Sequence, residues 1–416
     1  MRARRWRLSR LCCSYSWAFS AGFWVSRPDR VRSRLLPNRP YPRAARRGMC
    51  SIFDMSRGRL QLFVLLTLGW GIGVGLSGCV SRYPQAAMRV RDGRSDGILL
   101  ESLPCVRQTR YQCGPAALEM VMGYWGREID SDSVAAQVFD VEDRTTTVQA
   151  MAAFEPPPGY WVSAGYHDGP GLLARLESGM PIIVLLERSR PNFQGGHYHV
   201  VHGVDRTRKL LFMSSGAGCD RLMSWPLFEY LWERTGHWLM VICPLDVPTD
   251  TWPMTAGEYV DRGWHLERNE RWAEAEISYQ RALTINPAFV QARVNAGNLM
   301  MGQGRWSEAE ALFREGLTLR PEEPRMRNNL AWTLGMLDRV TDGLALAEEL
   351  VREQGGTEHA RLEYLDTWAW LLVRAGRGEE GRAILGQALE RARAEEAPVA
   401  ILEGLERHYR EAVHGE

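Results

Sequence analysis

The feature that most constrains the fold is a residue pattern that recurs at an interval of 34 positions in the last third of the chain. One copy consists of Tyr259, Gly263, Leu266, Ala275, Tyr279, Ala282 and Pro287. The next consists of Arg293, Gly297, Met300, Ala309, Phe313, Gly316 and Pro321. Small residues at fixed positions let paired helices touch, and a proline ends the second helix of each pair. The pattern therefore predicts stacked pairs of helices.

Two looser copies follow. The third contains Ala331, Leu334, Gly343, Ala347 and Leu350; the fourth, after a short insertion over 354–361, contains Trp368, Ala369, Leu372, Gly381, Leu385 and Ala388. An interval of 34 residues is that of the tetratricopeptide repeat, and three to four units suffice to bury a solenoid core. The fixed period argues against an ordinary helical bundle. We expect an all-α tetratricopeptide solenoid over 255–395 that docks a protein partner or substrate.

The stretch Gln108 to Leu118 contains a cysteine followed by Gly-Pro, at the start of a run with helical apolar spacing. Pro115 fits the first turn of a helix, where a missing N–H costs nothing. Cys113 would then lie at a helix N-terminus, whose dipole favours the thiolate over the thiol. The thiolate is the nucleophilic form, so the pattern points to a catalytic cysteine.

A thiol nucleophile needs a histidine within hydrogen-bond reach. Among nine histidines, His265, His359, His408 and His414 fall in the helical repeats or the tail and are interpreted as surface residues, and His237 precedes a strand. The stretch from His197 to Asp205 reads as a strand entered from Gly195-Gly196. His199 and His202 are interpreted as structural histidines of the sheet. His197, at the start of the strand, is the candidate base.

Helices come first and strands later between residues 98 and 247, which predicts an α+β domain. Helices are expected after Cys113 and over 131–139, 145–154, 172–178 and 225–232. Strands are expected over 181–186, 197–204, 210–213 and 238–242. Pro244, Pro248 and Pro253 mark a linker to the repeats.

With these residues in place, residues 98–245 resemble the papain-like double-glycine cysteine peptidases, which remove leader peptides from bacteriocins. The resemblance rests on Gln108, the Cys113-Gly-Pro helix start and the His197-Tyr-His-Val-Val strand with its following Gly and Asp. It implies that Cys113 is the nucleophile and His197 the general base and acid. It also implies that the Gln108 amide and the Cys113 N–H stabilise the oxyanion. Gln112 is a rival for the oxyanion role, but its adjacency to Cys113 argues against it.

One part of the family pattern is missing. The family normally places an Asp-Pro at the end of the strand after the histidine, and its carboxylate orients the imidazole. Here Ser215-Gly216 stands at that place. Ser215 could orient His197 through a neutral hydrogen bond, Asp220 could reach in from a loop, and Asp205 is less plausible because it begins a turn. A weaker third member leaves room for an inactive, peptide-binding domain.

The N-terminal region has the order of a bacterial lipoprotein signal. Arg57 and Arg59 precede an apolar run that ends in Leu-Ser-Gly-Cys79, so residues 55–78 are expected to be a signal peptide and Cys79 the lipidated residue. The alternative is an uncleaved membrane anchor. Residues 1–54 are interpreted as an upstream extension from a misassigned start, and 79–97 as a linker.

Charge is divided unevenly. Residues 1–59 hold 15 arginines against two aspartates, a net of +13; since the whole chain carries +1, residues 60–416 carry −12. An acidic bulk argues against nucleic acid as a partner. After residue 54 the chain contains Cys105, Cys219 and Cys243 besides Cys79 and Cys113. A disulfide between Cys219 and Cys243 is conceivable in an oxidising periplasm, but their spacing does not establish it. No spacing indicates a metal site, and the mechanism requires no cofactor.

The sequence thus predicts a lipid-anchored cysteine peptidase on the periplasmic face of the cell envelope, at the outer rather than the inner membrane. Its substrate would be a peptide or protein of the periplasm, because a leader peptide is removed before export. A non-catalytic adaptor in an envelope complex is the alternative. An acyltransferase or amidase would use the same acyl-enzyme step.

Overall fold

The structure is a computed structural model that describes residues 82–108, 111–187, 195–249 and 252–414. The predicted upstream extension over 1–54, the predicted signal peptide over 55–78 and the predicted lipidation site Cys79 lie outside the described residues. Within the described part of the chain, no helix combines the length and apolar composition needed to cross a bilayer.

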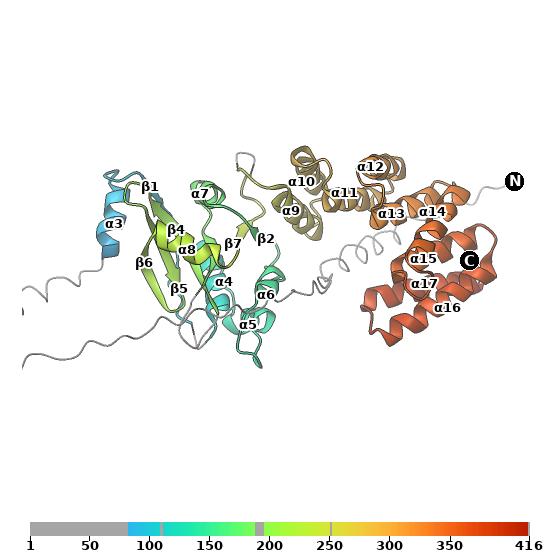
Figure 1. Ribbon diagram of the computed structural model, residues 1–416, viewed down its shortest axis with the longest axis horizontal. Helices are drawn as coiled ribbons and strands as arrows, with labels where there is room; N and C mark the ends of the chain where they lie inside the picture. The colour runs from blue at the N-terminus through green and yellow to red at the C-terminus, as the bar shows by residue number, and fades with distance from the viewer. Residues whose placement is uncertain (1–81, 109–110, 188–194, 250–251, 415–416) are drawn as a thin grey trace, which may run out of the picture.

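A seven-stranded sheet forms the centre of the first domain (Figure 1). Its strands are β1 (Gly97–Leu99), β2 (Tyr160–Tyr166), β3 (Ile182–Glu187), β4 (Gly196–Asp205), β5 (Leu210–Ser215), β6 (Gly218–Ser224) and β7 (Trp238–Pro244). Their order is β2-β7-β3-β4-β5-β6, with β1 paired to the far end of β4, and every pair is antiparallel. The start of β4 and the end of β5 therefore lie at one end of the sheet, and the site is found there.

Helices cover both faces of the sheet. One apolar cluster joins α4 (Cys113–Tyr124), α5 (Ser131–Val138) and α6 (Val148–Ala152) to β4 residues such as Tyr198 and Val200. The other joins α7 (Gly169–Glu177) and α8 (Trp225–Glu233) to the opposite face, where Val201 and Val204 point. Because neighbouring strand residues point to opposite faces, each strand contributes to both cores.

The first domain is α+β, as predicted, but three of its strands, β1, β2 and β6, were not expected. β2 carries small or polar residues at Ser163, Ala164 and Gly165, and β6 is a polar edge strand, so neither has the apolar run that indicates a strand. Their positions explain the composition. A helix of the repeats packs on β2, and β6 ends the sheet.

The prediction of a linker over 79–97 is wrong for its described part. Residues Arg82–Arg91 form helix α3, and β1 begins at Gly97. The helix buries only Ala86 and Ala87, against Phe212 of β5, while Tyr83 and Val90 pack at its sides. So few apolar positions leave little periodic signal in the sequence.

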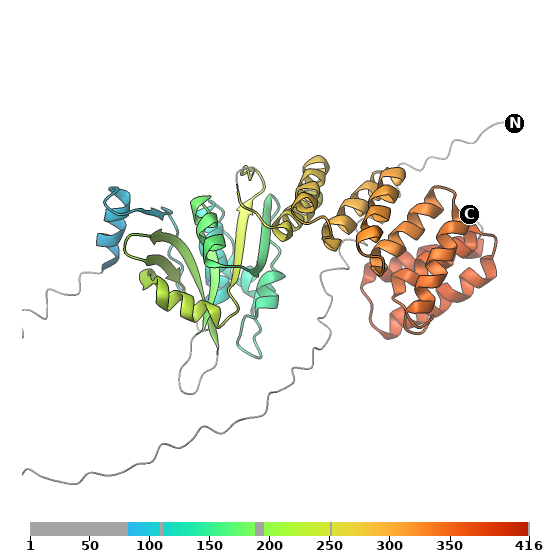
Figure 2. The same cartoon turned by 45° about the horizontal axis from the view of Figure 1, so that its top comes forward.

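The second domain is all-α and consists of stacked helix pairs (Figures 1 and 2). The helices are α9 (Ala256–Arg268), α10 (Trp272–Ile285), α11 (Val290–Gly302), α12 (Trp306–Leu319), α13 (Pro324–Met336), α14 (Val340–Glu353), α15 (Leu362–Arg374), α16 (Gly378–Ala394) and α17 (Val399–His414). The periodic glycines are packing positions. A Cβ at Gly263 would lie 2.5 Å from the Tyr279 ring, and one at Gly297 would lie 2.3 Å from the Phe313 ring.

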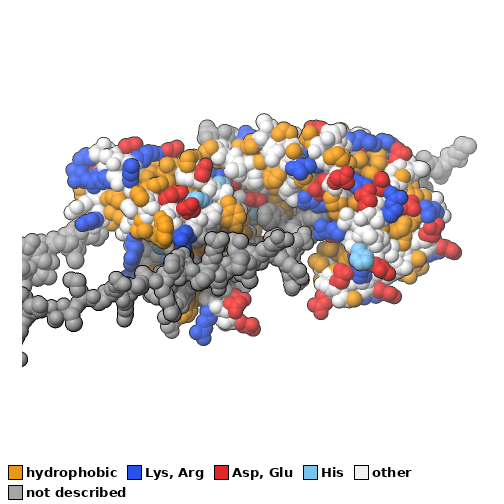
Figure 3. All heavy atoms as spheres, in the orientation of Figure 1, with side chains coloured by type: hydrophobic (Ala, Val, Ile, Leu, Met, Phe, Trp, Pro, Cys, Tyr) orange, Lys and Arg blue, Asp and Glu red, His pale blue; other side chains and the backbone are white. Residues whose placement is uncertain are grey.

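A second periodic feature holds the pairs in register. Arg271, Arg305, Arg339 and Arg377 each occupy the N-cap of a second helix and pair with a carboxylate three residues later. Arg305 and Arg339 also reach Glu276 and Glu310 of the preceding pair. Acidic and basic side chains are interspersed over the visible face of the repeats (Figure 3). In the first pair, the equivalent Arg271 instead reaches Asp246, which follows β7.

The two domains share one apolar core. The cluster on the α7–α8 face continues from Trp161 of β2 into Val260 and Leu266 of α9 and onward to α10 and α11. A buried ion pair joins Arg175 of α7 to Glu258 of α9, and Ser163 donates a hydrogen bond of 2.5 Å to Asp261. We call these contacts of α9 with β2 and α7 the repeat junction.

Two histidines that were predicted to lie on the surface are buried. His265 of α9 is 6% exposed, and burial lowers its pKa to about 3. His408 of α17 is 5% exposed, and its Nδ1 lies 2.6 Å from Asp366 Oδ1 of α15. Burial opposes the charge of His408, but its pairing with Asp366 outweighs this and raises its pKa. The prediction failed because it assigned both positions to the outside of the repeats, whereas each faces a neighbouring element.

Candidate active site

Helix α4 begins at Cys113, as the Cys-Gly-Pro pattern predicts. Tyr111 has a positive φ of 71° and Gln112 is the N-cap residue, so the chain turns sharply just before the cysteine. The first N–H groups of a helix have no acceptor within the helix and create a positive end. Cys113 is half-buried, whereas Gly114 and Pro115 behind it are buried. The sulfur is therefore attached where a helix favours negative charge and solvent still reaches.

The start of α4 lies against the start of β4. The charge of Cys113 acts on the phenol of Tyr198, whose pKa is raised first by burial and then by this neighbour. Tyr198 also donates a hydrogen bond of 3.2 Å to the Thr146 carbonyl, and a Cβ at Gly114 would lie 2.6 Å from the Thr146 side chain. Tyr198 is the residue after His197. The fold thus brings Cys113 to the part of β4 where the histidine candidate lies.

His197 is the second residue of β4 and is 7% exposed. Its ring makes an edge contact with the ring of His199, with centroids 4.8 Å apart and planes at 86°. Tyr198 points to the α4 face of the sheet, and side chains alternate along a strand, so His197 lies on the opposite face at the start of β4. Val200 pairs with Ser214, and it follows from the alternation that buried Ser215 shares the face of His197.

Gln108 is held at the end of β5. Its backbone N–H donates to the Gly216 carbonyl over 3.0 Å. Its side chain lies across the α-carbon of Gly216, where a Cβ would be 2.4 Å from Gln108 Cβ and 2.6 Å from Gln108 Oε1. A Cβ at 216 would therefore require the Gln108 side chain to move. Gly216 forms a platform on which Gln108 lies.

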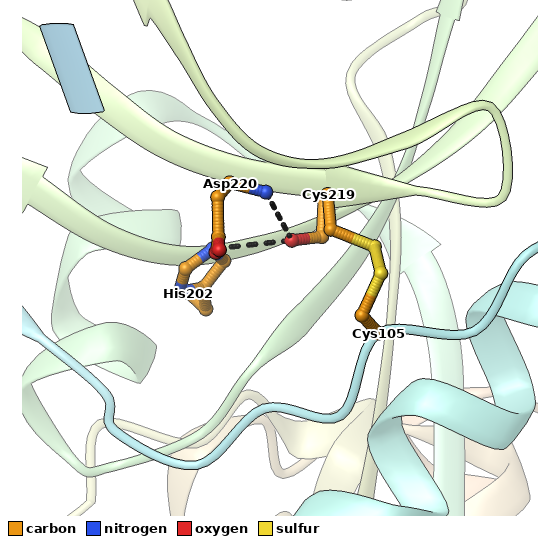
Figure 4. Close-up of a disulfide and its surroundings, with 5 residues drawn as sticks. Cys105, His202, Cys219 and Asp220 are labelled. Atoms are coloured by element: carbon orange, nitrogen blue, oxygen red, sulfur yellow. Dashed lines mark hydrogen bonds between the residues drawn. A yellow bond between two sulfur atoms is a disulfide. The ribbon is translucent and has the colours of Figure 1, made fainter. Parts of the chain in front are cut away.

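A disulfide joins Cys105 to Cys219, with Cα atoms 5.8 Å apart (Figure 4). The Cys219–Cys243 bridge that the sequence left open as one possibility is therefore wrong. Cys243 lies on β7 and Cys219 on β6, and three strands separate β7 from β6 in the sheet. With strands about 4.8 Å apart, these cysteines are far beyond the ~7 Å limit for a bridge.

Two carboxylates that were considered as partners of His197 lie elsewhere. Asp220 lies beside His202, as Figure 4 shows, and it hydrogen bonds to Tyr83 of α3. Its N–H donates to Ser214 Oγ, which in turn lies 3.5 Å from His202 Nε2. Asp205 is at the opposite end of β4, where it caps the turn by accepting from the Arg208 N–H. Ser215, which lies on the same face of the sheet as His197, remains the candidate for orienting the His197 imidazole.

Besides Cys113, the cysteine of the described residues that lies outside the disulfide is Cys243. It is fully buried, and burial raises its pKa to about 12. It is therefore a neutral thiol at physiological pH and makes an internal comparison for Cys113. The described residues contain no group of three or more His, Cys, Asp or Glu arranged to hold a metal ion.

Three contributors to the site were missed by the sequence reasoning: Gly216, Tyr198 and the Cys105–Cys219 disulfide. The substitution of Gly for the family's proline at 216 was visible but its role was not, because it depends on Gln108 lying above it. The disulfide had a faint signal. Cys105 precedes Gln108 by three residues and Cys219 follows Gly216 by three.

Comparison with known families agrees with this division of the chain. Residues 100–237 match the Peptidase_C39 like family, and residues 266–333 match the tetratricopeptide repeat. The chain therefore contains a Peptidase_C39-like domain followed by tetratricopeptide repeats. No curated protein matches the chain.

The solved structures that are similar to this chain include repeat proteins. YrrB, described as a tetratricopeptide protein with an unusual peptide-binding site, is 18% identical, with a TM-score of 0.29 over 38% of this chain and 91% of its own. TTC0263 from Thermus thermophilus is 13% identical, with a TM-score of 0.33 over 45% of this chain and 90% of its own. MamA from Desulfovibrio magneticus is 12% identical, with a TM-score of 0.32 over 37% of this chain and 84% of its own.

Proposed function

We propose that the chain is a cysteine peptidase of the cell envelope, with Cys113 as nucleophile, His197 as general base and acid, and Gln108 as oxyanion donor. One observation carries the proposal. The start of α4, the start of β4 and the Gln108 platform at the end of β5 meet at one end of the sheet, although 84 residues separate Cys113 from His197. A nucleophile, a base and an amide donor are the parts that acyl transfer by a thiol requires.

The mechanism follows from these roles. His197 takes the proton of the Cys113 thiol, and the sulfur attacks the carbonyl carbon of the scissile bond. The oxygen becomes negative in the tetrahedral intermediate, where the Gln108 side-chain amide and the Cys113 N–H donate hydrogen bonds to it. His197 then protonates the leaving amine. Water, deprotonated by the same imidazole, hydrolyses the thioester and restores the thiol.

Ser215 favours a second candidate function, a peptide-binding adaptor without catalysis. A serine hydroxyl orients an imidazole by a neutral hydrogen bond and stabilises the imidazolium less than a carboxylate does. The adaptor would bind a peptide at the same end of the sheet and leave it uncleaved. The two functions differ in one measurable property, the reactivity of Cys113.

We further propose that the repeats dock a protein or peptide and that the chain is held in the envelope by lipid on Cys79. A disulfide at Cys105–Cys219 supports an oxidising compartment, because such bonds persist mainly outside the cytoplasm. The junction supports a joint role for the domains, since α9 continues the core of the sheet rather than hanging on a tether.

The test is labelling with an electrophilic thiol probe such as iodoacetamide. We expect wild-type protein to be labelled at Cys113, and we expect Cys113→Ala to lose that label while its circular dichroism spectrum is unchanged. Cys243→Ala is the matched control. It removes a thiol whose raised pKa makes it inert, and it should label as wild type does.

Turnover then separates the two functions. A peptidase consumes envelope peptides in the wild type and loses at least ~10³-fold in rate with Cys113→Ala, since removing a nucleophile leaves only residual catalysis. Equal labelling of wild type and Cys113→Ala would refute the reactive cysteine. Labelling without turnover, together with an identical bound peptide in both forms, would favour the adaptor.

A further inference from the structure

Residues 100–108, the segment that carries Gln108, form neither a helix nor a strand. We call it the Gln108 segment. It runs from the end of β1 towards α4, and its first residue is fixed to β4 by a hydrogen bond of 2.8 Å from the Leu100 N–H to the His202 carbonyl. A coil of this kind has many accessible conformations, and ordering it costs conformational entropy. Something must therefore fix Gln108 at its far end.

Two ties do this, and they form a regular pair. The Gln108 N–H bonds to the Gly216 carbonyl, and Cys105 is bonded to Cys219. Cys105 and Gln108 are three residues apart, and so are their partners Cys219 and Gly216. The two stretches of chain run in opposite directions, as in a short antiparallel pairing. The disulfide thus attaches the segment to the start of β6, three residues away from the glutamine.

We propose that the Cys105–Cys219 disulfide is the positioning element of the oxyanion donor, so that turnover requires the oxidised protein. The proposal rests on the proposed peptidase function of Cys113. A single backbone hydrogen bond contributes little net free energy, because water competes for both groups. The disulfide removes this freedom by a covalent link that closes a loop spanning 114 residues. A displacement of about 1 Å in a catalytic group can cost ~10²-fold in rate.

The same link is open to reductants. Cys105 is exposed and Cys219 is half-buried. A dithiol would break the bond by thiol–disulfide exchange, giving two electrons and two protons to form two cysteine thiols while it becomes a disulfide itself. The Gln108 segment would then be held by its hydrogen bonds and by the partly buried Leu103 and Val106. Turnover would fall in a reducing compartment, before export, and rise after the disulfide has formed.

The role of Gln108 distinguishes this loss from a general disturbance of the site. An oxyanion donor acts on the tetrahedral intermediate of acyl transfer. Alkylation of Cys113 by iodoacetamide forms no such oxyanion and depends on the thiolate alone. Loss of the positioning element should therefore reduce kcat for a peptide and leave the alkylation rate of Cys113 unchanged.

The experiment compares wild type, Cys105→Ser/Cys219→Ser, Gln108→Ala and the triple variant in the full chain. We expect Gln108→Ala to lower kcat by about 10²–10³-fold, as for other oxyanion donors. The double serine variant should lose about 10–10²-fold, with KM and the Cys113 alkylation rate within about twofold of wild type. The triple variant should be no slower than Gln108→Ala, because a donor that is absent cannot be misplaced.

Three variants or treatments serve as controls. Dithiothreitol should lower the turnover of wild type and leave the double serine variant unchanged. Cys243→Ala removes a cysteine outside the link and should behave as wild type. Gly216→Ala keeps the disulfide but places a Cβ in contact with Gln108, so it should lower kcat like the serine variant.

Amide hydrogen exchange tests the link without any turnover. The Gln108 N–H should be protected in wild type and exchange at least about tenfold faster in the double serine variant. Unchanged exchange would overturn the positioning role, whatever the activity. Faster exchange in a protein that cleaves no peptide would retain the positioning role and refute the peptidase. Two other results would also overturn the positioning role. One is a triple variant whose kcat falls by the product of the losses of Gln108→Ala and the double serine variant. The other is a double serine variant whose Cys113 alkylation rate falls together with its kcat.

Discussion

The Gln108 segment and the repeat junction are held to the same sheet by opposite means. The Gln108 segment has one disulfide and a few backbone hydrogen bonds, and its apolar side chains Leu100, Leu103 and Val106 are only partly buried against the core. The repeat junction has no disulfide among the described residues, but it has a continuous apolar core and the Arg175–Glu258 pair, whose side chains are 3% and 2% exposed. A coil that must stay near solvent to meet substrate buries less apolar surface than a helix that lies on a sheet, so it gains less stability from burial.

This difference predicts separate responses. Loss of the covalent tie should change turnover, and loss of the buried pair should change the stability of the two-domain unit. The helix α9 begins with a capping box in which Glu258 accepts from Thr255 and from Arg175. The first turn of the repeats is thus built around the same carboxylate that joins the domains.

The largest expected effect on stability is that of Glu258→Ala. It leaves the Arg175 guanidinium buried without its carboxylate, which costs about 3–5 kcal/mol of unfolding free energy. Urea unfolding at pH 7 measures it. The alkylation rate of Cys113 should stay that of wild type below the transition, because the site is held by its own tie.

Glu274→Ala is the matched control for Glu258→Ala. It removes a carboxylate from the half-exposed pair with Arg271, for which we expect a loss below about 1 kcal/mol. Similar losses for the two variants would contradict the view that the buried pair holds the junction. A fall in the alkylation rate with Glu258→Ala would show that the site and the junction are coupled.

The comparison also shows what the sequence can predict. The helix pairs followed from the interval of 34 residues, because each repeat contacts its neighbours in the same way. The start of α4 at Cys113 followed from local chemistry. By contrast, the Cys105–Cys219 link depends on which strand ends the sheet, and the order of strands is not written in local patterns. The α3 helix was missed because two alanines make most of its buried contact.

The sequence predicted the candidate site residues, but it did not predict the contacts that hold them in place. Gln108, Cys113 and His197 were selected from motif spacing, and the fold brings their elements to one end of the sheet. The roles of these residues stay predictions. Asp220 and Asp205 could not be excluded from spacing alone, because both lie near β4 or β5 in sequence. The structure separates them by strand end and by face.

A second prediction concerns charge at the repeat junction. Asp261 lines a pocket of about 460 Å³ together with Ser163, Glu258 and His167, and burial raises its pKa to about 7. Between pH 4 and pH 7 the unfolded chain releases this proton and the folded protein keeps it. Asp261 therefore stabilises the fold fully only below pH 4, and its contribution falls as pH rises to 7.

Asp261→Asn removes this titration and keeps an oxygen that accepts from Ser163. Relative to wild type, the variant should gain about 1–2 kcal/mol of unfolding free energy between pH 4 and pH 8, after allowance for solvent access to the pocket. Urea unfolding of both proteins at the two values measures the difference, in which the titration of other groups cancels. A difference independent of pH would mean that Asp261 is charged in the folded protein.

The smallest effect is expected from the arginines at the helix N-caps, and it tests how the first domain joins the repeats. Arg305 lies between two repeats and pairs with Glu276 and Glu308, and its side chain is 31% exposed. Arg271 occupies the same position one repeat earlier and pairs with Glu274 and with Asp246 of the first domain. If the first domain takes the place of a preceding repeat, both arginines should contribute alike.

We expect Arg305→Ala and Arg271→Ala each to lose about 0.5–1 kcal/mol of unfolding free energy, and less in 0.5 M salt, because exposed pairs are weak and screened. Equal losses would mean that the apolar core and the Arg175–Glu258 pair, and not the surface pair with Asp246, stabilise the repeat junction. A loss of several kcal/mol for Arg271→Ala alone would move part of that stability to the surface pair with Asp246. The repeat junction would then differ from the covalently fixed Gln108 segment in its surface ion pair as well as in its buried contacts.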